Sequence, residues 1–423
     1  MFLEKVEFNK KEIPLLSNKT GSDENQYSIV VGKNGIGKSR LLNKIISTVS
    51  CEENIVAITT SPFDKFPINK GSINYNYVGP RSTSAKTISS TIASILTTNH
   101  SNIEAFSKTI KALSLLPEIK LMTVSGEEFL KAGITTKVIE EAFCDNGKGY
   151  IKRKIKKELE SVITKSRGVN RVESSLALRI HSSVLSEAGD LYRFLDENRS
   201  YIFKERLISI EGDKSYDFSE LKELKRHKVI NINDIILFND DGTSFKASEA
   251  SSGQQCTIMI ILGIASKIKD NSLILIDEPE ISLHPHWQKQ FIPLLKSCFN
   301  NYKNCHFVIA THSPLIISEL KSDNCHIVDM NRGGSYSASK FANKSSDFQL
   351  AELFGEPGDN NEYLKRLVIE LMSSFSRNSG LSKEENNEYM HLKKMAKGLD
   401  KDDTVKHFIN VLDTAIERVN KYD

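Results

Sequence analysis

Several features are scarce or missing in this sequence, and each absence disfavours a class of protein. None of the six cysteines stands in a C-x-x-C pair, so we expect reduced thiols and no zinc site. No run of roughly 18 or more apolar residues occurs, so we expect no membrane-spanning segment. The first residues show neither the charged nor the apolar region of a signal peptide. These absences together indicate a cytoplasmic protein with no membrane partner.

The charge is nearly balanced, with a formal net charge of +3 at pH 7, so composition alone requires no nucleic-acid partner. Two basic runs, within 152–171 and 222–228, could contact phosphates without sequence preference. A solvated helix face is the simpler interpretation, because Glu158 and Glu160 follow Lys157 within the first run. The sequence leaves open whether these runs bind DNA.

The order of strand and helix patterns predicts an α/β fold. Residues 1–82 contain strand-like segments, and strands alternate with helices again within 229–345, which is typical of a parallel sheet with crossover helices. The stretch 83–228 and the tail 346–423 are mostly helical in pattern. We therefore predict a two-part sheet core, a helical insertion within it, and a helical C-terminal region that either contacts a partner or packs on its own core. The strands predicted in the first stretch include Tyr27–Val31, Ile55–Thr60 and Ile73–Val78.

A phosphate-binding loop is predicted at Gly32–Ser39, which matches G-x-x-x-x-G-K-[ST] between a strand and a helix. Glycines let backbone N–H groups curl around phosphates, and the helix N-terminus adds its positive dipole end. In such a loop Lys38 bridges the β- and γ-phosphates and the Ser39 hydroxyl binds Mg²⁺. The alternative is a glycine-rich turn that precedes a helix by chance.

A second candidate element is the apolar strand 272–276, which ends in the adjacent acids Asp277 and Glu278. Beside the phosphate-loop strand, Asp277 would hold Mg²⁺ through water at the carboxyl end of the sheet. Glu278 would polarise the attacking water as a general base. The alternative is a core strand that ends in a charged surface turn.

Two smaller elements also suggest phosphate chemistry. The segment Ala250–Gln254 opens a helix and offers a hydroxyl and free N–H groups to a phosphate, although Ser251 could equally be an ordinary N-cap. A strand beginning at His306 ends close to His312, which could hydrogen-bond a γ-phosphate or the catalytic water. A polar residue at the end of a strand is the plainer interpretation of His312.

The order of these elements resembles the ABC-class ATPase superfamily, in particular its non-transporter group of SMC-like, RecF-like and OLD-like proteins. In that resemblance Gly32–Ser39 is Walker A, Ser272–Glu278 is Walker B, Ala250–Gln254 is the signature motif, Ile281–Pro285 is the D-loop and His312 is the switch histidine. The resemblance implies Mg²⁺ and ATP as cofactors, with Asp277 and Ser39 on the metal and Glu278 and His312 as catalytic residues. The ATP contacts that it implies are Gly32, Asn34, Gly35, Gly37, Lys38, Ser39, Arg40, Ser251, Gly253 and Gln254.

The family binds ATP between Walker A of one subunit and the signature motif of another, so the resemblance implies an ATP-dependent dimer or higher oligomer. In that arrangement Ser251 and Gly253 contact the γ-phosphate of the other subunit's ATP. The family's usual glutamine between Walker A and the insertion is missing, because no glutamine occurs between Gln26 and Gln254. Arg81 and Ser82 are the nearest substitutes, which makes slow hydrolysis an expectation.

The Leu-His-Pro D-loop and the segment Ser61–Phe66 resemble bacterial anti-phage ATPases of the Septu type and their retron-associated relatives. The resemblance implies a separate nuclease effector, and it allows a retron reverse transcriptase and nucleic acid as further partners. The tail 346–423 lacks the alternating strands and clustered acids of a Toprim nuclease, so we expect no nuclease chemistry in this chain.

Two other functions remain as alternatives. The first is a RecF- or SMC-like DNA-repair ATPase that binds DNA directly, which the near-neutral charge and the missing coiled coil weigh against. The second is a transporter ATPase subunit. The separation of more than 200 residues between Lys38 and Asp277 disfavours that reading.

Overall fold

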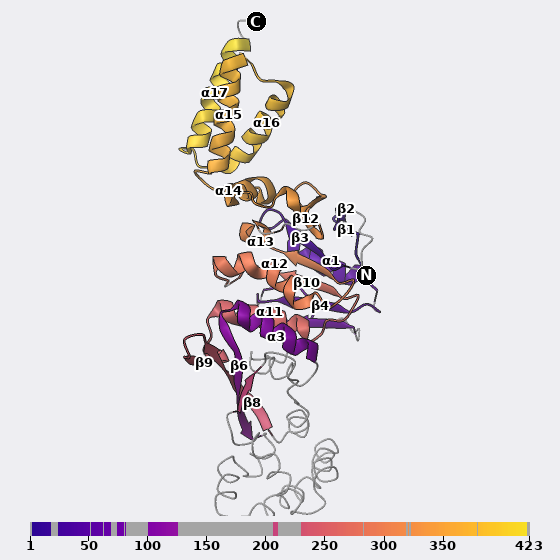
Figure 1. The fold of residues 1–423 in the computed structure, drawn as a ribbon. Coiled ribbons are helices and arrows are strands. Elements are labelled where there is room, and N and C mark those ends of the chain that lie inside the picture. The colour runs from indigo at the N-terminus through magenta and orange to yellow at the C-terminus, as the bar shows by residue number, and fades with distance from the viewer. Residues whose placement is uncertain are drawn as a thin grey trace, which may run out of the picture. The chain divides into compact units, whose positions relative to one another are not determined.

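The computed structural model divides the chain into two compact units, Met1–Thr83 with Lys267–Asp423, and Ser84–Ser266. Figure 1 shows the elements of both units along the chain. The structure describes residues 2–17, 24–50, 52–61, 63–68, 74–79, 81, 100–125, 206–209, 230–281, 283–318, 320, 323–378 and 380–420. Both predicted basic runs, within 152–171 and 222–228, lie outside these residues.

The first unit is built on a seven-stranded sheet in the order β13-β12-β3-β11-β10-β4-β5. All neighbouring strands run parallel except β13, which pairs antiparallel with β12. This parallel-dominated sheet with crossover helices confirms the predicted α/β class. The strands are β3 (Gln26–Val31), β4 (Ile55–Thr59), β5 (Tyr75–Val78), β10 (Leu273–Asp277), β11 (His306–Ala310), β12 (Cys325–Asp329) and β13 (Gly334–Ser337). A separate antiparallel pair, β1 (Lys5–Phe8) and β2 (Lys11–Pro14), precedes them.

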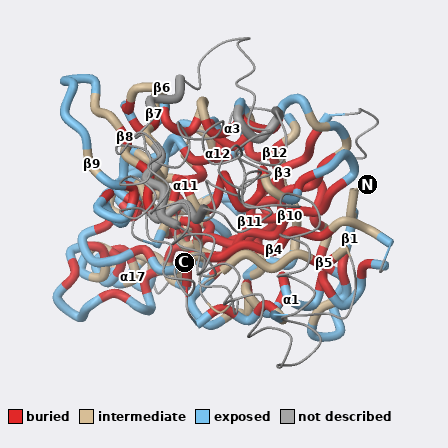
Figure 2. Tube along the Cα trace, turned by 90° about the horizontal axis from the view of Figure 1, so that it is seen from below, coloured by how far each residue is buried: buried red, intermediate tan, exposed pale blue. Residues whose placement is uncertain are grey.

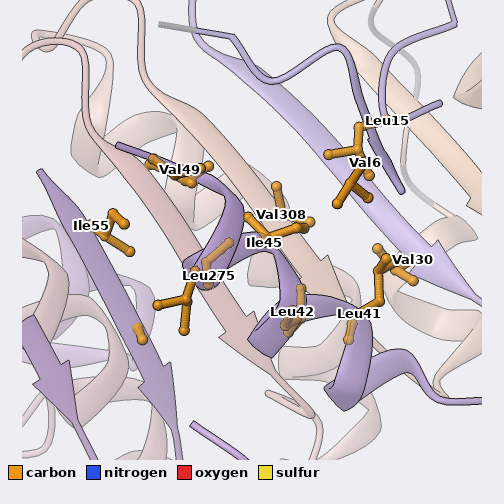
Figure 3. Close-up of a cluster of buried hydrophobic side chains, with 14 of the residues drawn as sticks. Val6, Leu15, Val30, Leu41, Leu42, Ile45, Val49, Ile55, Leu275 and Val308 are labelled. Atoms are coloured by element: carbon orange, nitrogen blue, oxygen red, sulfur yellow. The ribbon is translucent and has the colours of Figure 1, made fainter. Parts of the chain in front are cut away.

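Helices cover the sheet on both faces, which explains why its central strands are buried along their whole length (Figure 2). On one face α1 (Lys38–Thr48) packs Leu42 and Ile45 in the same cluster as Leu275 and Val308 (Figure 3). Successive strand residues point to opposite faces, so Phe307 lies on the other face. There its ring lies 6.0 Å from that of Phe299, which belongs to α12 (Pro285–Phe299).

The second unit holds a four-stranded antiparallel sheet in the order β7-β6-β8-β9 together with two helices that pack on each other, α3 (His100–Ala112) and α11 (Ser252–Ala265). Its strands are β6 (Leu115–Ser125), β7 (Arg206–Ser209), β8 (Ile230–Asn239) and β9 (Ser244–Lys246). The mostly helical pattern expected over 83–228 therefore misses β6 and β7. These two strands gain their hydrogen bonds from partners far along the chain, which a local pattern does not show.

The C-terminal region is helical, as the sequence predicts, and its helices pack on one another. It begins with α14 (Ser346–Gln349) and a π-helical turn, η3 (Leu350–Phe354), after the short α13 (Pro314–Ser318). Three longer helices follow, α15 (Glu362–Asn378), α16 (Lys383–Met395) and α17 (Thr404–Asn420). Within the described residues, no helix has both the length and the apolar character that a membrane crossing requires.

Two apolar residues of α15 lie in opposite environments, and this difference predicts how their substitution changes stability. Leu364 is fully buried, whereas Ile369 is 49% exposed. We expect Leu364→Ala to destabilise the three-helix region by about 2–5 kcal/mol through the cavity that it leaves. Ile369→Ala on the same helix should change stability by less than about 0.5 kcal/mol. Hydrogen exchange of the α15–α17 amides measures this region separately, and equal effects of the two changes would contradict the packing.

Candidate nucleotide-binding site

The predicted phosphate loop connects the end of β3 to the start of α1 and adopts a backbone that requires glycine. Gly37 is the N-cap of α1 with φ of 107°, and an added Cβ would lie 3.1 Å from the Phe8 ring. Gly32 has φ of 149° and is enclosed by Ile36 and Met330. Gly35 and Asn34 are exposed at the tip of the loop, and Arg40 is exposed on the first turn of α1.

Lys38 is the buried cation of this loop, with only 5% of its surface exposed. Its ammonium donates to the carbonyl oxygens of Gly32 at 2.8 Å and Lys33 at 3.3 Å, and it lies 3.2 Å from His312 Nδ1. Burial lowers the pKa of Lys38 to about 8, although the nearby carboxylates oppose this shift, with Glu278 the strongest of them. The side chain thus curls back over the predicted phosphate loop.

The residues expected to hold Mg²⁺ are brought together, since the Ser39 hydroxyl donates to Asp277 Oδ1 at 3.1 Å. A hydroxyl and a carboxylate are oxygen ligands of the kind that Mg²⁺ prefers. The described residues contain no group of three or more His, Cys, Asp or Glu side chains suited to a metal. A Mg²⁺ ion here would accordingly take its remaining ligands from phosphate oxygens and water.

The Asp277 carboxyl has a pKa above its ordinary value. The residue is 3% exposed, and burial raises its pKa to about 7. The Ser39 hydrogen bond lowers that pKa, while the negative charge of Glu278 raises it. A divalent cation at this carboxylate would favour the ionised form and reverse the shift.

Glu278 and His312 face each other beside Lys38. Glu278 Oε1 lies 3.7 Å from His312 Nε2, and about a third of each side chain is exposed. Glu278 has a positive φ of 49°, an uncommon backbone conformation for a non-glycine residue that is often found at functional sites. Its N–H donates to Ala310 O at 2.9 Å, which ties the turn after β10 to the end of β11.

His312 is neutral at pH 7, because burial and the adjacent Lys38 charge lower its pKa to about 4. An ammonium can only donate, so Nδ1 accepts the hydrogen bond from Lys38 and the ring proton resides on Nε2. That N–H lies on the side of the ring that faces Glu278. The imidazole is therefore a neutral hydrogen-bond donor next to Glu278 and Lys38.

Glu280 is a site residue that the sequence analysis did not single out. Its carboxylate accepts hydrogen bonds from the His312 backbone N–H and from the Thr311 hydroxyl at 2.9 Å. Burial raises its pKa, although these bonds oppose the shift. Glu280 thereby fixes the backbone that carries His312. The only signal for Glu280 in the sequence was that an acid follows Asp277 by three residues, and many surface turns also carry an acid.

The predicted signature residues lie at the start of α11, in the second unit. Ser251 is the N-cap, and its hydroxyl accepts from the Gln254 N–H at 3.3 Å. The Gln254 side chain in turn accepts from the Ser251 backbone N–H at 3.1 Å, which completes a capping box. Gly253 is buried in the first turn of this helix. Contact of these residues with ATP on another subunit stays a prediction.

Arg81, one proposed substitute for the missing glutamine, is held by a buried acid. Its Nε donates to Asp64 Oδ2 at 3.0 Å, and the Tyr77 hydroxyl donates to the same oxygen at 2.9 Å. The Asp64 side chain is fully buried, and its charge also raises the pKa of Asp277. Ser82 and the D-loop residue Ser282 lie outside the described residues.

Parts of this chain are similar in sequence to known proteins. A family model described as "AAA domain, putative AbiEii toxin, Type IV TA system" matches residues 129–318. Retron Vc95 probable ATPase of Vibrio cholerae serotype O1 biovar El Tor is 23% identical over 185 residues, which are 41% of this chain and 34% of that protein. Retron Ec83 probable ATPase of Escherichia coli is 28% identical over 116 residues, which are 25% of this chain and 20% of that protein.

A third relative, Protein ea59 of Escherichia phage lambda, is 27% identical over 135 residues, which are 29% of this chain and 25% of that protein. The chain thus spans about a third or less of the length of the curated relatives that it matches. Among solved structures, the Smc head domain of Pyrococcus furiosus aligns with a TM-score of 0.23 at 14% identity, over 61% of this chain and 59% of that one. The ATP-binding cassette MJ1267 of an ABC transporter gives 0.27 at 11% identity, over 82% and 92%.

By sequence, the chain is thus similar to an AAA-domain family over residues 129–318 and, over part of its length, to two probable ATPases of retrons.

The raised pKa of Asp277 predicts how the stability of the metal-free protein depends on pH. The carboxyl ionises near pH 4 when unfolded but only near pH 7 when folded, so its ionisation disfavours the fold increasingly as pH rises between these values. We expect Asp277→Asn to be more stable than the parent at about pH 8, and close to it at about pH 4.5.

Thermal unfolding of both proteins at each pH measures this difference in stability, because the contributions of titratable groups that both proteins share cancel. Asp402→Asn, which removes an exposed carboxylate from the same unit, is the control and should behave as the parent does. An Asp277→Asn protein less stable than the parent at pH 8 would show that this carboxylate is not penalised by burial.

Proposed function

We propose that the chain binds Mg²⁺-ATP at the edge of the seven-stranded sheet and hydrolyses it slowly. The observation that carries this proposal is the position of Lys38. Its buried ammonium is held by two loop carbonyl oxygens beside a neutral histidine, and the hydroxyl of the next residue, Ser39, donates to Asp277. The bound Mg²⁺ would neutralise phosphate charge and orient the β- and γ-phosphates.

The chain's own residues divide the remaining work. Lys38 exchanges its carbonyl partners for phosphate oxygens, which recover the hydrogen bonds of the buried ammonium. Glu278 accepts a proton from the attacking water, for which its partly exposed carboxylate is placed. The neutral His312 donates from Nε2 to the transferred phosphoryl group, and Glu280 keeps its backbone in position. Burial of this cluster strengthens each interaction.

The signature segment makes the site dependent on a second copy of the chain. Ser251 opens α11 with a side-chain cap, so the N-terminal end of this helix can face an anion. In the proposed assembly Ser251 and Gly253 of one copy close over ATP bound to Lys38 and Ser39 of another. ATP then acts as a clamp between copies, and slow hydrolysis prolongs the clamped state.

The proposed biological role is regulation of a separate effector, a nuclease, in bacterial anti-phage defence. Two relatives carry retron ATPase names, which supports a retron-linked role, with a reverse transcriptase and nucleic acid as further partners. The ATP-dependent assembly would hold or release the effector.

The roles of Glu278 and Lys38 predict two separable defects. Glu278→Gln should lower the rate of ATP hydrolysis by about 100-fold or more, because it removes the general base, while Mg²⁺-ATP still binds. Lys38→Ala should abolish ATP binding. Steady-state phosphate release and equilibrium titration with ATP measure the two quantities. The exposed Glu370→Gln is the control, and hydrolysis at the parental rate in Glu278→Gln would exclude Glu278 as the base.

The effector role predicts co-purification from the native operon. We expect the tagged protein, isolated with Mg²⁺-ATP from cells carrying Glu278→Gln, to bring down a nuclease in fixed stoichiometry. Mass spectrometry and nucleic-acid extraction identify what is bound. Recovery of this protein alone, with ATP-dependent DNA binding that falls steeply with salt, would instead support the DNA-repair function.

A further inference from the structure

The segment 350–356, which belongs to the C-terminal part of the chain, contacts the phosphate loop. Asn331, just after β12, bridges the two. Its side-chain oxygen accepts from the Lys33 N–H at 3.2 Å, and its side-chain nitrogen donates to Leu353 O at 2.8 Å. Gly355 then turns the chain with φ of 68° against the Lys33 side chain, where an added Cβ would lie 2.6 Å from Lys33 Cε.

Glu356 follows this turn and presents a carboxylate to the loop. Its Oε1 accepts from the Asn34 backbone N–H at 3.4 Å. The charge of Glu356 reaches further into the site, since it raises the pKa values of both Lys38 and His312 against the dominant effect of burial. A carboxylate thus lies at a loop amide, close to the two groups expected to meet the γ-phosphate.

From these contacts we infer that Glu356 opposes ATP binding by placing a negative charge on the phosphate loop, so that ATP must displace the segment 350–356. The inference rests on the proposed function, because it requires the loop to bind phosphates. Backbone N–H groups in such a loop are an anion-binding site, and two anions cannot share one amide without strong repulsion. Glu356 is accordingly a built-in competitor of the nucleotide.

The same segment is anchored to the C-terminal helices through Glu352. This carboxylate accepts from Arg332, which follows β12, and from the Tyr363 hydroxyl of α15 at 2.9 Å. His391 of α16 lies 3.2 Å away. Burial alone would raise the pKa of Glu352, but the bonds from Arg332 and His391 outweigh it and lower the pKa. Displacement of 350–356 by ATP would therefore change the contacts that Glu352 makes with α15 and α16.

This connection couples nucleotide binding to ligand binding at the C-terminal helices. Because ATP displaces the segment 350–356 from the loop, a ligand of the helices that holds the segment away from the loop raises the affinity for ATP. A partner bound to the three-helix region would therefore strengthen ATP binding.

The first test compares Mg²⁺-ATP affinity by equilibrium titration in the parent, Glu356→Gln and Glu370→Gln. The Gln side chain keeps the size of Glu356 and removes its charge, so we expect the dissociation constant to fall by about fivefold or more. Glu370→Gln removes an exposed carboxylate of α15 and should leave it unchanged. An unchanged or weaker affinity in Glu356→Gln would overturn the inference.

The second test follows hydrogen exchange of the backbone amides of 350–358 with and without Mg²⁺-ATP. We expect ATP to speed exchange in the parent, because the segment leaves the loop, and to have no such effect in Lys38→Ala. Slower or unaltered exchange in an ATP-bound parent would overturn the inference while leaving the proposed function intact. A parent that binds no ATP would refute the proposed function and the inference together.

Discussion

The Lys38 ammonium organises the candidate site, because a buried cation must be surrounded by partners that offset its lost hydration. The partners that meet this need are the carbonyl oxygens of Gly32 and Lys33 and a neutral His312. The ammonium also depresses the pKa of that histidine, after the larger effect of burial, and so keeps it uncharged. The buried charge of Lys38 thus accounts for the tight glycine-bearing loop, the deprotonated Nδ1 of His312 and the nearby carboxylates.

The parallel sheet is what assembles this environment from distant parts of the chain. Strand β11 lies between β3 and β10, with Ala310 in register with Val30 on one side and Asp277 on the other. All three strands run the same way, so the loop after β3, the acids after β10 and the histidine after β11 meet at one edge. Burial on both faces fixes the register of these strands, and with it the spacing of the site.

The sequence could predict those parts of the site that depend on residues close together in the chain. A strand pattern is followed by a phosphate-loop motif at Gly32–Ser39, and another is followed by the adjacent acids Asp277 and Glu278. That these two segments lie close together follows from the parallel topology. Glu280 and Glu356 were not predicted, because their roles depend on contacts made across the fold. The strands β6 and β7 were not predicted for the same reason.

A structure determined with Mg²⁺ and a non-hydrolysable ATP analogue tests the nucleotide site most directly. We expect the β- and γ-phosphates at Lys38, with Mg²⁺ beside Ser39 and Asp277 and with the Glu356 carboxylate withdrawn from Asn34. Nucleotide bound elsewhere on the chain, with the Lys38 ammonium still on the carbonyl oxygens of Gly32 and Lys33, would contradict this expectation.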